Sequence, residues 1–154
     1  MIQTVSDILR SKGSGAVSVL PSDNVIKALE IMAERNIGAV LVMDTQGIVH
    51  GIFSERDLAR KMIIKSHSCE NEKVESIMTS KVIFVQPETT LESCMNLMTE
   101  HRIRHLPVLE NNKVTGIISI GDVVKALIET KDRIISEQAF ELGQAERAQQ
   151  KGVV

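Results

Sequence analysis

The chain carries one pattern of residues twice, and this internal repeat constrains its fold more than any other feature. Residues 51–57 read Gly-Ile-Phe-Ser-Glu-Arg-Asp, and residues 116–122 read Gly-Ile-Ile-Ser-Ile-Gly-Asp, so glycine, serine and aspartate recur at one constant offset. Each copy is a short apolar run that meets Ser-x-x-Asp and then passes into a segment with helical periodicity. Such repetition predicts a duplicated unit in which a strand leads directly into a helix.

The repeat extends well beyond this motif at nearly the same offset. The further matches are 5–9 with 74–78, 19–21 with 85–87, 31–34 with 97–100, and 37–42 with 103–108. The first copy has gained three residues in a Gly- and Ser-rich loop around 11–15. Because loops tolerate insertions better than strands do, the two copies are expected to share one fold.

Each copy predicts the order helix, strand, helix, two strands and helix, which is an α/β chain of the α+β type. In the first copy the strands are expected at 17–20, 39–43 and 48–53, and a helix at 58–64. The first long helix would be capped by Ser22 or Asp23, and Val25, Ala28, Leu29 and Met32 would form its apolar face. In the second copy the strands are expected at 82–85, 106–109 and 114–119, and helices at 88–100 and 123–128. Thr89 and Glu92 would form a capping box.

These patterns divide the chain into a first repeat (1–66), a connector (67–73), a second repeat (74–130) and a tail (131–154). Apolar residues thin out beyond Lys131, so the tail is expected to begin as a helix and fray, with 149–154 disordered. Whether the tail packs on the body or serves as a partner arm stays open.

Composition narrows the classes of function. The formal net charge is −2, and the chain has three Phe and no Trp or Tyr, so neither a basic nucleic-acid surface nor an aromatic stacking platform is expected. No apolar run is long enough to span a bilayer, and residues 1–20 lack a secretory leader pattern. Cys69 and Cys94 fit neither a disulfide framework nor a metal site, and Cys94 is expected to be buried. A reducing cytoplasm is the default compartment.

Two interpretations of the Ser-x-x-Asp motifs compete. Ser54 with Asp57, and Ser119 with Asp122, fit a capping box that satisfies free backbone N–H groups without any ligand. The same hydroxyl could donate to a phosphate oxygen, and the same carboxylate could accept from ribose hydroxyls. Duplication, together with a glycine before each serine, favours ligand binding.

Cationic groups are distributed unequally between the copies. Arg56 has Gly121 as its counterpart, whereas Arg102, Arg104 and His105 stand where the first copy has Asn36, Gly38 and Ala39. A phosphate-facing patch before the second hairpin is therefore plausible, and a solvated strand edge is the alternative. His101 and His105 would not share a helical face, so zinc is not expected. No nucleophile–base pair is visible, and catalysis is not expected either.

These motifs resemble those of a tandem pair of cystathionine-β-synthase (CBS) domains, a Bateman module in its small stand-alone form. The resemblance covers residues 5–129 and also rests on Asn-Ile-Gly-Ala-Val-Leu-Val and His-Arg-Ile-Arg-His-Leu-Pro-Val. It implies two β-α-β-β-α repeats packed sheet to sheet about a pseudo-twofold axis, with two clefts between the sheets. It also implies homodimers shaped as flat discs.

The resemblance further implies a role for each candidate site residue. Asp57 and Asp122 would hold ribose, and Ser54 and Ser119 would meet phosphate. Arg56, Arg104 and His105 would neutralise phosphate charge. The base would be framed by Val17, Val19, Ile37, Gly38, Ala39, Thr79, Val82, Ile103, Arg104 and His105. The second cleft is expected to be the better-defined site, because it uses Arg104 where the first uses Gly38.

The expected function is a non-catalytic regulatory module that binds AMP, ADP, ATP, NAD or S-adenosylmethionine and reports energy or redox state. Since no enzyme or transporter domain is attached, it would signal to another protein in trans. The alternative is a protein-interaction scaffold whose clefts are vestigial and whose tail docks the partner.

Overall fold

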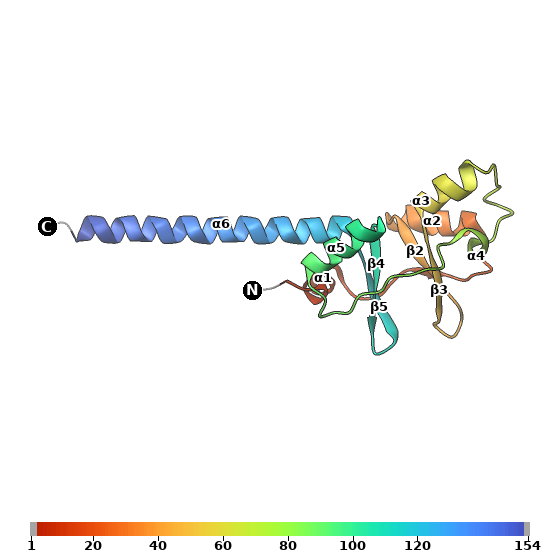
Figure 1. The fold of residues 1–154 in the computed structure, drawn as a ribbon, viewed down its shortest axis with the longest axis horizontal. Coiled ribbons are helices and arrows are strands. Elements are labelled where there is room, and N and C mark those ends of the chain that lie inside the picture. Colours follow the sequence, from red (N-terminus) through yellow and green to blue (C-terminus); the bar gives the residue numbers. More distant parts are fainter. Residues whose placement is uncertain (1–2, 153–154) are drawn as a thin grey trace.

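The structure is a computed structural model that describes residues 3–152 and shows two similar α+β units (Figure 1). The strands of the first unit are β1 (Ser18–Val19), β2 (Ala39–Met43) and β3 (Val49–Ser54). They form a sheet in the order β1-β2-β3, with β1 parallel to β2 and β2 antiparallel to β3. The helices are α2 (Val25–Arg35), the short turn α3 (Glu55–Asp57) and a π-helical segment, η1 (Leu58–Ile63). The helix predicted over 58–64 is therefore present, but as a π-helix rather than an α-helix.

The second unit contains α5 (Leu91–His101), the antiparallel hairpin of β4 (His105–Glu110) and β5 (Lys113–Ser119), and α6 (Ile120–Lys151). Both hairpins shift register at equivalent places, after Val42 in β2 and after Val108 in β4. The two hairpins lie side by side (Figure 1). Residues of both hairpin turns, including Gly47 and Asn112, line one shared groove. The duplication seen in the sequence is thus reproduced in backbone detail.

The strand predicted over 82–85 is wrong, because only Val85 pairs there, in a single parallel bridge with Val108. In the first unit the amide of Leu41 donates to the carbonyl of Val17 at 3.0 Å, which helps to hold β1 in place. The counterpart of Leu41 is Pro107, which has no N–H to donate. One proline in β4 therefore reduces the equivalent of β1 to one bridge.

The two short helices that precede the repeats are exchanged between the cores. Helix α1 (Val5–Lys12) places Val5 and Ile8 in the core of the second unit, with the amide of Val5 donating to the carbonyl of Thr89. Helix α4 (Val74–Ile77) buries its apolar residues in the core of the first unit. Each core is therefore completed by a helix that the sequence places before the other repeat.

The N-caps of α2 and α5 lie one or two residues from the predicted positions. The N-cap of α2 is Asn24, without a side-chain cap bond, whereas Asp23 accepts from the amide of Leu20 instead. The N-cap of α5 is Thr90, whose hydroxyl accepts from Ser93 N at 3.1 Å. The Thr89 hydroxyl accepts from the amide of Gln86, outside the helix. Several polar residues next to each helix start can serve as caps, so the pattern alone does not choose among them.

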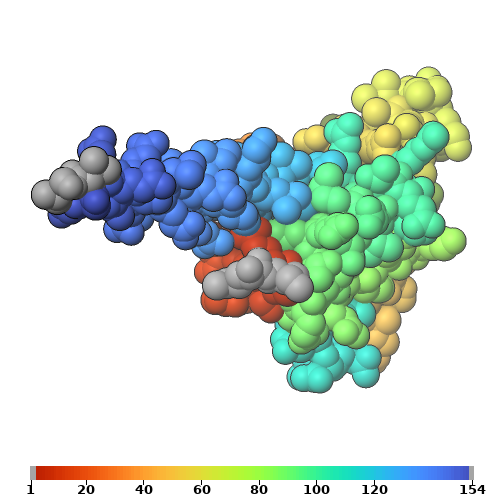
Figure 2. All heavy atoms as spheres, turned by 60° about the vertical axis from the view of Figure 1, so that its left-hand side comes forward, coloured from red at the N-terminus to blue at the C-terminus, as the bar shows by residue number. Residues whose placement is uncertain are grey.

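Helix α6 corrects the expectation for the tail. It runs without a break from Ile120 to Lys151 and extends as an arm beyond the body, with α1 beside its base (Figures 1 and 2). The predicted disorder is therefore wrong for residues 149–151, and residues 153–154 lie outside the described part. No proline follows Pro107 in the sequence. Residues 120–151 are also rich in Ala, Glu, Gln and Lys, which all favour helix. No helix within residues 3–152 is both long and apolar enough to cross a membrane.

Candidate ligand-binding cleft between the repeats

Both Ser-x-x-Asp motifs form capping boxes at the ends of β3 and β5. Ser54 N donates to Asp57 Oδ2 at 3.0 Å, and Asp57 N donates to Ser54 Oγ at 3.4 Å. The second copy makes the same pair of bonds at 2.8 and 3.2 Å, between Ser119 and Asp122. The capping interpretation is therefore confirmed for both copies. It leaves one carboxylate oxygen of each aspartate for other partners.

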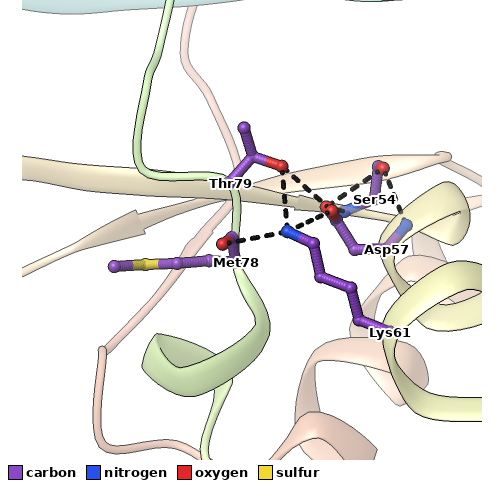
Figure 3. Close-up of polar contacts among 5 residues, drawn as sticks. All are labelled: Ser54, Asp57, Lys61, Met78 and Thr79. Atoms are coloured by element: carbon purple, nitrogen blue, oxygen red, sulfur yellow. Dashed lines mark hydrogen bonds and ion pairs between the residues drawn. The ribbon is translucent and has the colours of Figure 1, made fainter. Parts of the chain in front are cut away.

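The second oxygen of Asp57 lies at a polar junction between the repeats (Figure 3). Thr79 Oγ1 donates to Asp57 Oδ1 at 2.9 Å, and Lys61 Nζ lies 3.0 Å from the same oxygen. Lys61 also donates to the carbonyl of Met78 at 3.3 Å. Asp57 is the one buried charged residue in the described chain, with 7% of its surface exposed. A lysine and a hydroxyl therefore hold a buried carboxylate at the floor of the cleft.

Above this junction lies a cavity of about 510 Å³ with residues from both repeats in its wall. The first repeat contributes Ile52 from β3 and the residues of α3 and η1. The second contributes 79–83 and 102–107. Six basic side chains line the cavity: Arg56, Arg60, Lys61, Lys81, Arg102 and Arg104. Glu55 and Asp57 are the only carboxylates in this wall, so the cavity carries a marked excess of positive charge.

The structure brings nine of the candidate site residues together in this cavity. They are Gly38, Ser54, Arg56, Asp57, Thr79, Val82, Ile103, Arg104 and His105. The other six do not line it: Val17, Val19, Ile37, Ala39, Ser119 and Asp122. Val19 and Ala39 are almost fully buried, and Val17 and Ile37 pack against the first core. The side chains of these four residues therefore serve the first core rather than the cavity.

Sequence reasoning missed Arg60, Lys61 and Lys81 as cavity residues. Arg60 and Lys61 follow Asp57 by three and four positions, so a helical continuation places them near its carboxylate. That spacing could have identified Arg60 and Lys61 as neighbours of Asp57. Lys81 gave no comparable signal, because it comes from the other repeat and joins Asp57 in the cavity wall only through the fold.

Arg104 and His105 lie in the cleft of Asp57, whereas the sequence associated them with the second cleft. A side chain at Gly38 would approach the His105 ring, since an added Cβ would lie 3.5 Å from Nε2. Burial lowers the pKa of His105, and the charges of Lys12 and Arg104 lower it further, while Asp122 opposes the shift. The imidazole is therefore mainly neutral at neutral pH. His105 therefore lines the cavity as a polar group rather than as the expected cation.

Asp122 has a different partner, from helix α1. Lys12 Nζ lies 2.7 Å from Asp122 Oδ2 and donates to the carbonyl of Ile117 at 3.0 Å. Burial raises the pKa of Asp122, but the hydrogen bonds from Lys12 and Ser119 and the lysine charge outweigh it and lower the pKa overall. The second carboxylate is therefore held ionised by a lysine of the same chain.

Comparison with known proteins identifies the family that has this architecture. A family profile described as "CBS domain" matches residues 4–64 and again residues 74–129. The chain belongs to the CBS-domain family. The mixed fold of two packed repeats expected from the sequence is thereby confirmed. The CBS pair is 41% identical over 133 residues to the mitochondrial CBS domain-containing protein CBSX3 of Arabidopsis thaliana, an alignment covering 81% of this chain and 65% of the relative.

Solved structures share the fold. A protein with CBS domains from Burkholderia ambifaria has a TM-score of 0.79 and 46% identity, over 82% of this chain and 95% of its own. A CBS domain pair solved with 5′-methylthioadenosine and S-adenosyl-L-methionine has a TM-score of 0.73 at 22% identity, over 84% and 99%. At that identity the likeness shows the fold alone. The chain spans 65% of CBSX3 and about a quarter of the next curated relatives, and a cytoplasmic location remains a prediction.

The cysteines of this CBS pair occupy different environments. Cys94 is fully buried in the second core, as expected, and burial raises its pKa to about 11. Cys69 is half-buried and packs against the first core. Among the described residues no three His, Cys, Asp or Glu side chains lie close enough together to hold a metal ion. Neither thiol lines the cavity at Asp57.

Proposed function

We propose that this CBS pair is a regulatory module that binds an adenosine-containing nucleotide in the cavity at Asp57. The observation that carries the proposal is the cavity wall itself, which sets six basic side chains against two carboxylates. A concave site with one sign of charge concentrates ligands of the opposite sign. Phosphate groups match this demand, because arginine binds their oxygens with two parallel hydrogen bonds.

The rest of the wall suits a base and a sugar. Aliphatic side chains from both repeats line it and include Ile52, Val82, Ile83, Ile103 and Pro107. In a chain without Trp or Tyr, a purine would be held between such groups rather than stacked on aromatic rings. The Asp57 carboxylate could accept from ribose hydroxyls by releasing Thr79 or Lys61. S-adenosylmethionine, which carries a sulfonium cation, fits this charge less well than AMP, ADP, ATP or NAD.

The site is built to report occupancy through the arrangement of the repeats. Its wall comes from η1 and β3 on one side and from 79–83 and 102–107 on the other. Arg56 also donates across this boundary to the carbonyl of Arg102. A nucleotide that contacts both repeats favours one relative arrangement, and that difference in affinity is the coupling free energy available to a partner protein or a second copy.

A binding experiment with matched arginine variants tests this function. Titration calorimetry with AMP, ADP, ATP, NAD and S-adenosylmethionine would be run on the intact chain, on Arg104→Ala and on Arg133→Ala. Arg104 lines the cavity, whereas Arg133 lies exposed on α6. We expect Arg104→Ala to weaken nucleotide binding by about tenfold or more, since one charge-assisted hydrogen bond is lost. Arg133→Ala should bind as the intact chain does.

The outcome is clear in either direction. A nucleotide at about a hundred times its dissociation constant adds about 2.7 kcal/mol to the free energy of unfolding, which a thermal-shift measurement detects. Because the chain has neither Trp nor Tyr, co-purified nucleotide would also dominate its ultraviolet spectrum. A chain that binds none of the five ligands, freed of any co-purified nucleotide, would overturn the proposal.

Helix α6 favours a second candidate function, a scaffold that docks a protein through its arm. Ile128, Ile135 and Leu142 recur at a heptad spacing and therefore share one face. All three are at least half exposed. Ile135→Asp and Leu142→Asp should abolish partner capture, and Phe140→Asp, on another face, should not. If both faces behave alike, the arm is not a docking helix.

A further inference from the structure

The two repeats satisfy the carboxylates of their Ser-x-x-Asp motifs in different ways. In the first, Thr79 makes two bonds: its amide donates to the carbonyl of Ile52 at 2.8 Å, and its hydroxyl donates to Asp57 at 2.9 Å. The counterparts of Ile52 and Asp57 are Ile117 and Asp122. There, one ammonium group, Lys12 Nζ, makes both contacts, at 3.0 and 2.7 Å. A lysine ammonium thus replaces the backbone amide at Ile117, but on the aspartate it contacts the capping oxygen Oδ2, whereas Thr79 contacts Oδ1 of Asp57.

The three-residue insertion in the first repeat places this lysine. Helix α1 has eight residues, whereas its counterpart α4 has four. The longer helix carries Lys12 across to β5 before the chain turns at Gly13 and Gly15, which both have a φ of 99°. Gly15 N then donates to the carbonyl of Thr115 at 2.7 Å and fixes the loop against β5. The length of α1 and the fixed loop after it therefore position Lys12 next to Asp122.

The second cleft also lacks the basic residues of the first. The counterparts of Arg56, Arg60, Lys61, Lys81, Arg102 and Arg104 are Gly121, Lys125, Ala126, Gly15, Asn36 and Gly38. Only Lys125 keeps a positive charge. Lys12 adds one more, but Asp122 already neutralises it at 2.7 Å. A phosphate group entering here would lose water and meet few cations in return.

We propose that the two clefts are not equivalent: the cleft of Asp57 takes one phosphate-bearing ligand per chain, and the chain's own Lys12 occupies the cleft of Asp122. The inference rests on the proposed function and assigns it to one of two sites. Lys12 and the loss of the basic residues together keep a phosphate-bearing ligand away from Asp122. The Lys12 ammonium group neutralises Asp122 through Oδ2 and takes the carbonyl of Ile117, so that a ligand entering here would have to displace it.

Titration calorimetry with ATP tests this assignment through the number of ligands bound. Chain concentration would come from amino-acid analysis, since the chain has no Trp or Tyr. The variants are Arg60→Ala in the first cleft, and Asp122→Asn and Lys12→Met in the second, each checked for folding by circular dichroism. We expect one ATP per intact chain and an affinity about tenfold weaker in Arg60→Ala. Asp122→Asn and Lys12→Met should keep one site and change the affinity by less than about twofold.

Three other outcomes would overturn the inference, and only the last of them would also overturn the proposed function. Two ATP molecules per chain, with the second lost in Asp122→Asn, would overturn the inference and leave the proposed function standing. A single site lost in Asp122→Asn but kept in Arg60→Ala would move the ligand to the other cleft and overturn the inference equally. Absence of ATP binding to the intact chain, against clear binding of a non-phosphorylated ligand, would overturn both.

Discussion

Gly51 and Gly116 occupy equivalent positions in β3 and β5, yet alanine should be tolerated at only one of them. A Cβ on Gly51 would lie 2.8 Å from the carbonyl oxygen of Thr79 and 2.7 Å from Met78 Sδ. That carbonyl accepts from Ile52 N at 3.0 Å, and the Thr79 amide donates back at 2.8 Å, so the segment cannot retreat without straining both bonds. A Cβ on Gly116 would meet only the tip of a flexible side chain, Leu9 Cδ2, at 2.7 Å.

The magnitudes follow from these contacts. Overpacking against fixed backbone costs about 1–3 kcal/mol, so we expect Gly51→Ala to lower the free energy of unfolding by that amount. The corresponding fall in Tm is about 2–4 °C per kcal/mol for a chain of this size. For Gly116→Ala, the lower entropy of the unfolded chain offsets the small readjustment of Leu9, and the net change should stay within about 1 kcal/mol.

Urea unfolding followed by far-ultraviolet circular dichroism measures both variants without a Trp or Tyr signal. Because Thr79 lines the cavity, Gly51→Ala should also weaken nucleotide binding, whereas Gly116→Ala should not. Equal unfolding midpoints for the two variants would refute the reasoning, since the difference depends on backbone contact at one glycine and side-chain contact at the other.

Two further predictions concern the titratable side chains of His105 and Cys94. Burial lowers the pKa of His105, so below about pH 6.5 the unfolded chain binds more protons than the folded one. The free energy of unfolding should therefore fall as the pH drops through this range. His105→Gln should flatten that part of the profile, and an unchanged slope would exclude His105 as its source. Burial also raises the pKa of Cys94 to about 11, so its thiol should react with a disulfide reagent only after unfolding, and more slowly than Cys69; equal rates in the folded chain would contradict its burial.

The sequence predicted the duplicated fold well because the repeat preserves apolar periodicity and turn positions. Strand β2 matches its predicted bounds, and β3, β4 and β5 differ by one residue at one or both ends. The failure at 82–85 has a specific cause in Pro107, which removes a backbone donor from the neighbouring strand. A pattern confined to the segment itself cannot show that, because the missing bond belongs to its partner.

The candidate site was predicted in its parts but not in its grouping. Asp57, Thr79 and Arg104 were each identified, yet which cleft they share depends on how two repeats pack. The fold combines the end of β3 with segments of the other repeat, and helix α1 reaches Asp122 from more than a hundred positions away. Such contacts leave no local periodicity. The length of α6 was underestimated for a different reason, because apolar content was weighed more heavily than the helix propensity of its polar residues.

Titration of the isotopically labelled chain with ATP, followed by amide ¹H–¹⁵N spectra, tests the central claim most directly. The account predicts the largest shifts in 52–61, 79–83 and 102–105, around the cavity at Asp57. The amides near Lys12 and Asp122, and those of the distal part of α6, should move little. Shifts concentrated around Asp122, or confined to α6, would contradict the claim that the cleft of Asp57 is the nucleotide site.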